Sequence, residues 1–333
     1  MSFPFNAYLL ALVGACGVTF LTLPWWRRWS LRTGLVDDPG ARKIHHQPIP
    51  LAGGLAVMTG LMLPLLGGWL FLLWQSATPV DGGSAGLLDS YSLLKWGFGR
   101  RGGELAGIFA GAVGILFIGW LDDKHELRPA GKFAGQFLVA AVVAASGARI
   151  TLFVPNLAFH YAVTILWILT LVNAFNFMDN MNGLCGGLGA IAAWCFALQA
   201  AASGQYLVAL IAFLAVGSLV GFLPYNFPSA KVFLGDAGSH LVGYLMAVLA
   251  ILPHFYTAQN PRRSAVLLPL VILAVPLVDL AWVVMLRWRL GKPFYVGDTN
   301  HLSHRLVRSG LSPTRAVLVI WLLAALCGLV CLV

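Results

Sequence analysis

Long apolar runs are the feature that most constrains how this chain folds. A helix needs about 20 mostly apolar residues to cross the hydrocarbon layer of a membrane, and ten such runs occur within 333 residues. We therefore expect an all-α fold, a polytopic membrane bundle of about ten transmembrane helices, with residues 1–333 forming one integral-membrane domain. The runs cover residues 5–26, 52–74, 104–121, 131–147, 158–175, 184–202, 205–224, 239–253, 265–286 and 314–333.

The composition excludes several classes of protein. Only 10% of the residues are charged and 59% are hydrophobic, whereas about 25% are charged in an ordinary soluble domain. A cytosolic enzyme, a secreted disulfide scaffold and a disordered chain are excluded on this ground. The net charge of +9 would suggest nucleic acid as the partner of a soluble protein. In a membrane protein it indicates cytoplasmic loops, because Lys and Arg resist translocation, so we expect no nucleic-acid partner.

The distribution of basic residues predicts an orientation. Arg27, Arg28 and Arg32 follow the first run and no positive charge precedes it, so the N-terminus is expected outside. With ten spans, both termini then lie on the non-cytoplasmic side of the cell (inner) membrane. The predicted cytoplasmic segments hold fifteen of the 21 Lys and Arg residues, and they are 27–51, 122–132, 176–183, 225–238 and 287–315.

The acidic residues gather on the same predicted face. Eight of the 12 Asp and Glu residues fall in the cytoplasmic segments, although membrane topology does not require this. Mixed charge on one face of an otherwise apolar protein indicates a functional site there. On the opposite face, segment 75–103 is rich in Gly and Ser and is predicted to be a connector.

A pair of acids ends the third apolar run. Asp122 and Asp123 stand side by side at the predicted cytoplasmic boundary. Paired carboxylates can bind Mg²⁺ or remove a proton, and they are costly unless a cation or protonation relieves them. The alternative is that the neighbouring Lys124 neutralises one of them.

The first cytoplasmic segment carries Arg42, Lys43 and His45 between prolines, which suits phosphate binding or else a solvated loop.

An amide-rich segment follows the fifth run. Asn173, Asn176 and Asp179 are spaced three apart, so they share one face if the helix continues. Amides that lead to a carboxylate at a helix end suit a metal ion and a nucleotide base. The alternative is a polar helix cap that has no ligand.

Two further segments carry charge or histidine at the same face. Asp236 stands between glycines before the eighth run, where Ser239 is placed to cap the helix and exposed N–H groups favour phosphate. A plain capped turn is the alternative. His301, His304 and Arg305 follow the ninth run and suit a diphosphate. The two histidines also suit zinc, but nothing nearby completes a zinc set.

Taken together, these segments resemble the polyprenyl-phosphate N-acetylhexosamine-1-phosphate transferase family, whose members start O-antigen, enterobacterial common antigen and teichoic acid synthesis. The resemblance rests on RKIHHQPIPLAGG, the LDD pair, NAFNFMDNMNGL, FLGDAGS and HLSHRL, in this order between about residues 37 and 316. It implies a cytoplasmic site in a bundle of about ten helices. It also implies the reaction of a UDP-HexNAc with polyprenyl (undecaprenyl) phosphate, which gives polyprenyl-diphospho-HexNAc and UMP. Mg²⁺ is the implied cofactor, with Mn²⁺ as the alternative.

The resemblance also implies roles for single residues. Asp236 is the expected Mg²⁺ ligand, with Asn176 as a second. The expected catalytic residues are Asp122, Asp123, Asp179, His301 and His304, where the acid pair lies beside the lipid phosphate and the histidines lie near the diphosphate and sugar. Asn182 is expected to read the uracil. The other expected substrate-binding residues are Arg42, Lys43, His45, Lys124, Asn173 and Arg305.

Two departures from the family pattern leave the sugar open. The family often reads D-G-x-D-G-L where this chain has D-N-M-N-G-L from Asp179, and Ser303 stands where many relatives have another histidine. We expect GlcNAc-1-phosphate to be transferred. The alternatives are a phospho-MurNAc-pentapeptide transferase and, in a different class, a transporter or flippase whose pathway Asp279 would mark. The oligomeric state stays open, and a homodimer is one option.

Overall fold

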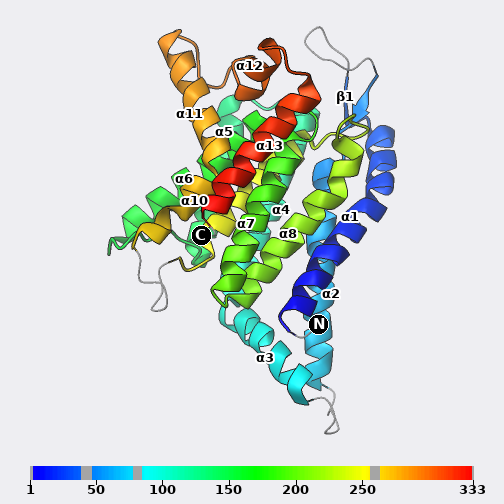
Figure 1. Cartoon of the computed structure of the whole chain (residues 1–333), viewed down its shortest axis with the longest axis vertical. Coiled ribbons are helices and arrows are strands. Elements are labelled where there is room, and N and C mark those ends of the chain that lie inside the picture. The colour runs from blue at the N-terminus through cyan, green and yellow to red at the C-terminus, as the bar shows by residue number, and fades with distance from the viewer. Residues whose placement is uncertain (1–2, 39–46, 78–84, 256–262, 332–333) are drawn as a thin grey trace.

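The computed structural model describes residues 3–38, 47–77, 85–255 and 263–331. It is almost entirely helical (Figure 1). Within these residues, eight helices are long and apolar enough to cross a membrane, or nine if one bent pair counts as a single span. The polytopic helical bundle is thereby confirmed. The eight helices are α1 Phe5–Thr33, α2 Gly53–Ala77, α4 Gly102–His125, α5 Pro129–Ser146, α6 Leu157–Met178, α7 Leu184–Ala202, α8 Tyr206–Asn226 and α13 Pro313–Val330.

The other two apolar runs differ from simple spans. The ninth run is divided into η1 Arg263–Leu267, α10 Leu268–Ile272 and α11 Ala274–Arg289, with a bend of 72°. Pro276 lies in the first turn of α11, and it has no N–H to donate to the carbonyl of Ile272, so the helix breaks there. The eighth run forms α9 Gly235–Ile251, which has only 17 residues.

Helix α9 is the centre of the bundle. Every residue from Ala237 to Ala250 is buried, and α2, α4, α6 and α7 pack around it. A helix that is apolar on most of its sides fits this position, because protein surrounds it. The outer helices instead expose large apolar side chains, such as Leu10 at 73% and Leu138 at 64%. Such exposure suits lipid rather than water.

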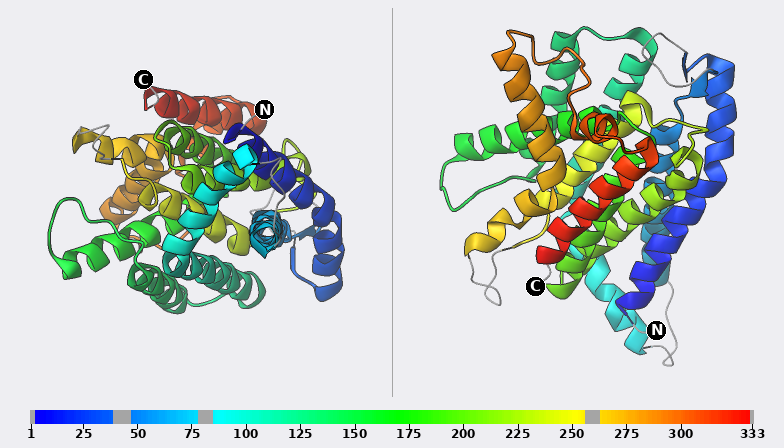
Figure 2. Two further views of the ribbon diagram at one scale, coloured as in Figure 1. Left: turned by 90° about the horizontal axis from the view of Figure 1, so that it is seen from below. Right: turned by 45° about the horizontal axis from the view of Figure 1, so that its top comes forward.

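The two ends of the bundle differ. At one end, β1 Val36–Asp37 and β2 Ile49–Pro50 form an antiparallel hairpin, and the short helix α12 Leu302–Arg308 lies nearby (Figure 1). At the other end lies α3 Ala85–Arg100. Segment 75–103, predicted to be a connector, therefore contains a helix. Helix α1 begins and α13 ends toward the α3 end (Figure 2), as expected for termini on one side, and which side is outside stays a prediction.

Candidate active site

A lysine joins two of the predicted acids. Lys132 lies in the first turn of α5, and its Nζ is 2.6 Å from Oδ2 of Asp122 and 2.7 Å from Oδ2 of Asp236. Asp122 comes from the end of α4 and Asp236 from the start of α9, so one ammonium group ties three helices together. The Asp236 side chain is 34% exposed and that of Asp122 only 10%, so Asp236 is the acid that a ligand reaches more easily.

Asp123 has a different role from its neighbour. Its carboxylate accepts hydrogen bonds from the backbone N–H groups of Asp236 (2.7 Å) and Ala237 (3.0 Å). It therefore caps the N-terminus of α9, where free N–H groups favour an anion. Ser239, which the sequence suggested as the cap, lies inside the helix instead, because α9 begins four residues earlier, at Gly235.

Two glycines allow this close approach of α4 and α9. A Cβ atom on Gly119 would lie 2.4 Å from the carbonyl oxygen of Asp236, closer than atoms can pack. Gly235 has φ +70°, and a Cβ there would lie 2.6 Å from Oδ2 of Asp123. Only glycine fits at either position, so the placement of the acids depends on these two residues.

The end of α6 completes this group. The amide nitrogen of Asn176 donates to Oδ1 of Asp236 (2.8 Å) and to Oγ of Ser239 (2.9 Å). The structure thus places Asn176 as a donor that orients the Asp236 carboxylate. Asp179 follows α6 directly, and its pKa is raised to about 8 by burial and by the negative charges of Asp236 and Asp123. We call Asp122, Asp123, Lys132, Asn176, Asp179 and Asp236 the acid cluster.

A second polar layer lies beneath the acid cluster. Asn173 donates to Oε1 of Gln136 (2.8 Å), and Nε2 of Gln136 is 3.5 Å from Nε2 of His240. Gln136 and His240 are fully buried. Each residue lies one helical turn from a member of the acid cluster on α5, α6 or α9, so this layer fixes the register of three helices. The predicted residue Asn173 therefore lies below the acids and not among them.

The predicted histidines form a separate group with buried partners. Nδ1 of His301 is 2.6 Å from Oδ2 of Asp279, and the other oxygen of Asp279 accepts the N–H of Leu302 (2.6 Å). The buried Arg287 donates from Nε to Oδ2 of Asp298 (2.8 Å). We call His301, His304, Asp279, Arg287 and Asp298 the histidine cluster.

Charge and burial shift the pKa values of two members of the histidine cluster. The pKa of His304 is lowered by partial burial and by the positive potential of His301 and Arg308. Burial acts to raise the pKa of Asp298, but the hydrogen bonds from Arg287 and from the backbone of Asn300 outweigh it, so the pKa is lowered. The loop that leads into α12 is thus held by an ionised carboxylate.

The end of α6 connects the two clusters. The Phe177 ring lies 5.8 Å from the His301 ring and 4.9 Å from the Arg287 guanidinium. Ser303 donates to Oδ1 of Asn180 (2.7 Å). Asn180 and Ser303 both stand where the sequence departs from the family pattern, so the two departures are in contact with each other.

Other predicted residues lie apart from these contacts. Nζ of Lys124 lies 5.2 Å from the Trp120 ring, so the neutralising partner of Asp122 is Lys132. The Arg305 guanidinium lies 5.0 Å from the Trp282 ring, and Asn182 donates to the carbonyl of Pro228 (3.1 Å). The predicted residues Arg42, Lys43 and His45 lie outside the described residues. The hairpin that flanks them is anchored beside Asp236, since Phe233 donates to the carbonyl of Pro50 (3.0 Å).

Sequence analysis missed three residues that the structure places in these clusters, namely Lys132, Arg287 and Asp298. It named Asp279 only as an acid that would mark a transport pathway. Lys132 and Asp298 were visible only as members of charged segments at the predicted cytoplasmic face. Asp279 carried a stronger signal, since an acid within an apolar run needs a partner. Arg287 stands near the end of an apolar run, where a basic residue reads as a topology signal.

The acid cluster suits a divalent cation. The Lys132 ammonium pairs with two carboxylates, those of Asp122 and Asp236, which leaves net negative charge that a cation would offset. Among the described residues, no group of three His, Cys, Asp or Glu side chains lies close enough together to hold a metal ion without other ligands. Mg²⁺ commonly binds one or two carboxylates and takes its remaining ligands from water and substrate phosphates. The donor set present here fits that mode of binding.

Comparison with known proteins identifies the family. Residues 105–254 match Glycosyl transferase family 4. The chain is 31% identical over 327 residues to a probable undecaprenyl-phosphate N-acetylglucosaminyl 1-phosphate transferase of Bacillus subtilis (strain 168), covering 95% of this chain and 82% of the relative.

The chain belongs to glycosyl transferase family 4. It is 32% identical to a decaprenyl-phosphate N-acetylglucosaminephosphotransferase of Mycobacterium tuberculosis (strain ATCC 25618 / H37Rv), over 94% of this chain and 79% of the relative. It is 28% identical to an undecaprenyl-phosphate alpha-N-acetylglucosaminyl 1-phosphate transferase of Escherichia coli (strain K12), over 92% and 78%. The glycosyl transferase family 4 protein described here is thus an enzyme and a multi-pass membrane protein.

Proposed function

We propose that this family 4 enzyme transfers GlcNAc-1-phosphate from UDP-GlcNAc to undecaprenyl phosphate and releases UMP at the cytoplasmic face of the cell membrane. The observation that carries the proposal is the acid cluster around Lys132, at one end of a membrane bundle. A lipid phosphate and a soluble nucleotide sugar can meet at such a boundary. The names of the relatives agree with this activity.

The proposed reaction is a phosphoryl transfer. An oxygen of the lipid phosphate attacks the phosphorus that carries the sugar, a new P–O bond forms, and the bond to the bridging oxygen of the diphosphate breaks, so that UMP leaves. A phosphate monoester has its second pKa near 6 and is largely dianionic at pH 7. The enzyme therefore needs to align the two phosphates and offset their charge more than it needs a strong base.

The acid cluster supplies the means to hold these anions. Asp236, the more exposed of the two acids that contact Lys132, would hold Mg²⁺, which when bound neutralises charge that develops on the diphosphate. The Lys132 ammonium offers a further positive charge between Asp122 and Asp236. Asp123 holds the first turn of α9 in place through its two backbone bonds. Asn176 orients the Asp236 carboxylate.

The histidine cluster would bind the diphosphate and the sugar. Asp279 fixes the His301 ring through Nδ1, which leaves Nε2 of His301 for a ligand. His304 is expected to be neutral at pH 7 because its pKa is lowered. The exposed Arg305 would attract phosphate. Transport finds less support, since both oxygens of the intramembrane acid Asp279 are already engaged, one by His301 and one by the backbone N–H of Leu302.

A direct assay tests the proposed activity. The purified enzyme in lipid nanodiscs is incubated with undecaprenyl phosphate and a panel of UDP-sugars, and UMP release is measured with Mg²⁺, with Mn²⁺ and with EDTA. We expect UMP release with UDP-GlcNAc that requires both the lipid and the divalent cation. Turnover only with UDP-MurNAc-pentapeptide would contradict the proposed sugar, and no turnover with any UDP-HexNAc would contradict the proposed function.

A further inference from the structure

Helix α3 has a buried face that fastens it to the bundle. It lies across the end of the molecule opposite the hairpin and α12 (Figure 1), and it packs on α8 and α4. Leu94 is only 4% exposed, a Cβ on Gly97 would lie 3.2 Å from the Leu207 side chain, and the Phe98 ring lies 5.0 Å from Trp69. Positions 94, 97 and 98 share one helical face. Because this face packs against the bundle, the opposite face of α3 is turned away from it.

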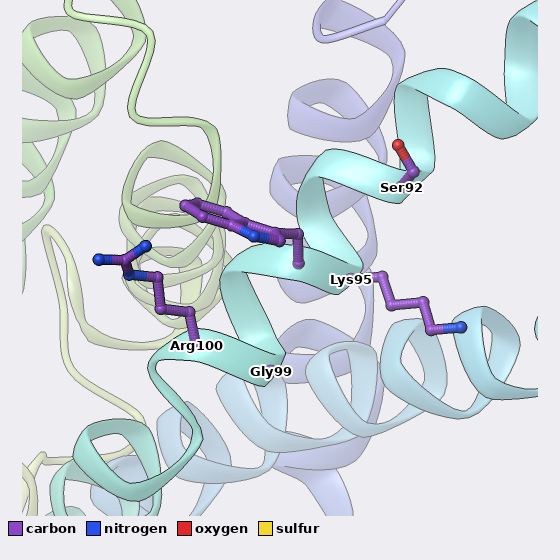
Figure 3. A pocket seen from close by; sticks show the side chains of 5 residues that line it. Ser92, Lys95, Gly99 and Arg100 are labelled. Atoms are coloured by element: carbon purple, nitrogen blue, oxygen red, sulfur yellow. The ribbon is translucent and has the colours of Figure 1, made fainter.

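The opposite face of α3 is apolar, aromatic and basic. Leu93 is 48% and Trp96 is 63% exposed, and the Arg100 guanidinium lies 5.2 Å from the Trp96 ring. A shallow pocket on this side is lined by Ser92, Lys95, Trp96, Gly99 and Arg100. The Arg100 head lies on one flank of it and Lys95 on the other (Figure 3). Between Ser92 and Arg100 the sequence has two basic residues and no acid.

We propose that α3 lies in the headgroup layer of the membrane and binds anionic phospholipids through Lys95 and Arg100. The membrane must end near α3, because α2 ends and α4 begins beside it. Trp and Arg side chains suit that layer, since each has an apolar body and a polar tip. Lipid phosphates supply the negative charge that the two basic residues lack among the described side chains of α3.

The basic residues near this face differ in whether they already have a charged or polar partner. Arg101, which follows α3, is already held by Glu104 (3.5 Å) and by His254 (2.8 Å). Among the described residues, the Arg100 guanidinium contacts only the Trp96 ring and Lys95 forms no ion pair, so both charges are available to a ligand. A Cβ on Gly99 would meet no atom within 4 Å, so a headgroup has room beside it.

The first test measures lipid binding by the full chain. Purified protein in a neutral detergent is titrated with phosphatidylglycerol or phosphatidylcholine, and bound lipids are counted by native mass spectrometry. The double variant Lys95→Gln/Arg100→Gln is compared with the charge-preserving control Lys95→Arg/Arg100→Lys. We expect the Gln variant to bind phosphatidylglycerol about fivefold more weakly for each base lost, the control to bind normally, and UMP release in neutral nanodiscs to be unchanged.

Several results would overturn this proposal. Equal phosphatidylglycerol binding by the wild type and the Gln variant would overturn it, and so would competition by inorganic phosphate as strong as that by the lipid. A change in the mass of the assembly without a change in bound lipid would instead indicate that a second copy covers this face.

A second test does not depend on removing charge. The fluorescence of wild-type protein is compared with that of Trp96→Phe in nanodiscs, so that the difference reports Trp96 alone. We expect lipids brominated near the headgroup to quench this difference signal more strongly than lipids brominated deep in the chain. Quenching by aqueous acrylamide alone would place Trp96 in water and contradict the proposal.

Discussion

The acid cluster and the histidine cluster lie at the same end of the bundle but are held in different ways. Helix packing holds the acid cluster, since α4, α5, α6 and α9 meet directly and Gly119 lets two backbones touch. The histidine cluster stands on a loop and on the seven-residue helix α12. Two side-chain pairs, Arg287–Asp298 and Asp279–His301, fix it to α11.

This difference predicts how each cluster responds to substitutions. In the acid cluster, direct contacts join the side chains of Lys132, Asp122 and Asp236, so the loss of one charge changes the balance of the whole group. In the histidine cluster, the functional side chains are held in place by partner side chains, as Asp279 holds the His301 ring. We therefore expect the largest losses from changes in the acid cluster, and graded losses from changes in the histidine cluster.

The strongest contrast is between two acids that each accept from one basic side chain. Asp236→Asn keeps the shape but removes the charge beside Lys132, and we expect UMP release to fall on the order of 10³-fold. Asp298→Asn makes the same change beside Arg287, and we expect a loss of about tenfold. Initial rates in nanodiscs measure both. Similar losses for the two variants would remove the distinction between the clusters.

The orienting role of Asp279 gives an intermediate effect. Asp279→Asn should lower kcat by about 10- to 100-fold, because the His301 ring loses its charged partner, whereas KM for undecaprenyl phosphate should change little. Ser303→Ala, which removes only the bond to Asn180, should cost less than Asp279→Asn. A change confined to KM for the lipid would show that Asp279 does not act through His301.

The variant Gly119→Ala adds one methyl group and tests how closely α4 and α9 pack at the acid cluster. Gly119→Ala forces a Cβ against the backbone of Asp236, so we expect the free energy of unfolding to fall by about 1–3 kcal/mol. Gly103→Ala on the same helix meets no atom within 4 Å and serves as the matched control. SDS titration monitored by circular dichroism measures both variants, and equal stability would contradict the close contact of α4 and α9.

The smallest effect concerns pH. Because the pKa of His304 in the folded protein lies below its usual 6.5, the unfolded chain binds this proton first as the pH falls. Its contribution to stability is therefore present above about pH 6.5 and is lost as the pH falls below it. The drop in the melting temperature between pH 7.5 and 5.5 should be smaller in His304→Gln than in the wild type. An identical drop would contradict the lowered pKa.

Much of the fold could be predicted from sequence because bilayer thickness sets a length for apolar runs. All ten runs became helical segments. The departures arise where protein rather than lipid is the surrounding medium, as for the short central helix α9. Helix α3 was missed because its apolar face is short, and only contacts with Leu207 and Trp69 reveal it.

Members of the candidate site were predictable where acidic and amide residues are grouped within short segments of the sequence. Asp122, Asp123, Asn176, Asp179 and Asp236 do converge at one end of the bundle. Their separate roles were not predictable, because the cap formed by Asp123 depends on how α4 meets α9. Lys132 reaches Asp236 across 104 residues of sequence, and no local pattern reports such a contact.

Lys132 supplies the positive charge that joins Asp122 and Asp236 in the acid cluster. If this charge is needed for the proposed reaction, Mg²⁺-dependent UMP release must distinguish Lys132→Met from Lys124→Met on the neighbouring helix end. We predict a loss of about 10²- to 10³-fold for Lys132→Met, partial recovery in Lys132→Arg, and near-normal rates for Lys124→Met. Near-normal turnover by a folded Lys132→Met protein, or an equal loss in Lys124→Met, would contradict the account.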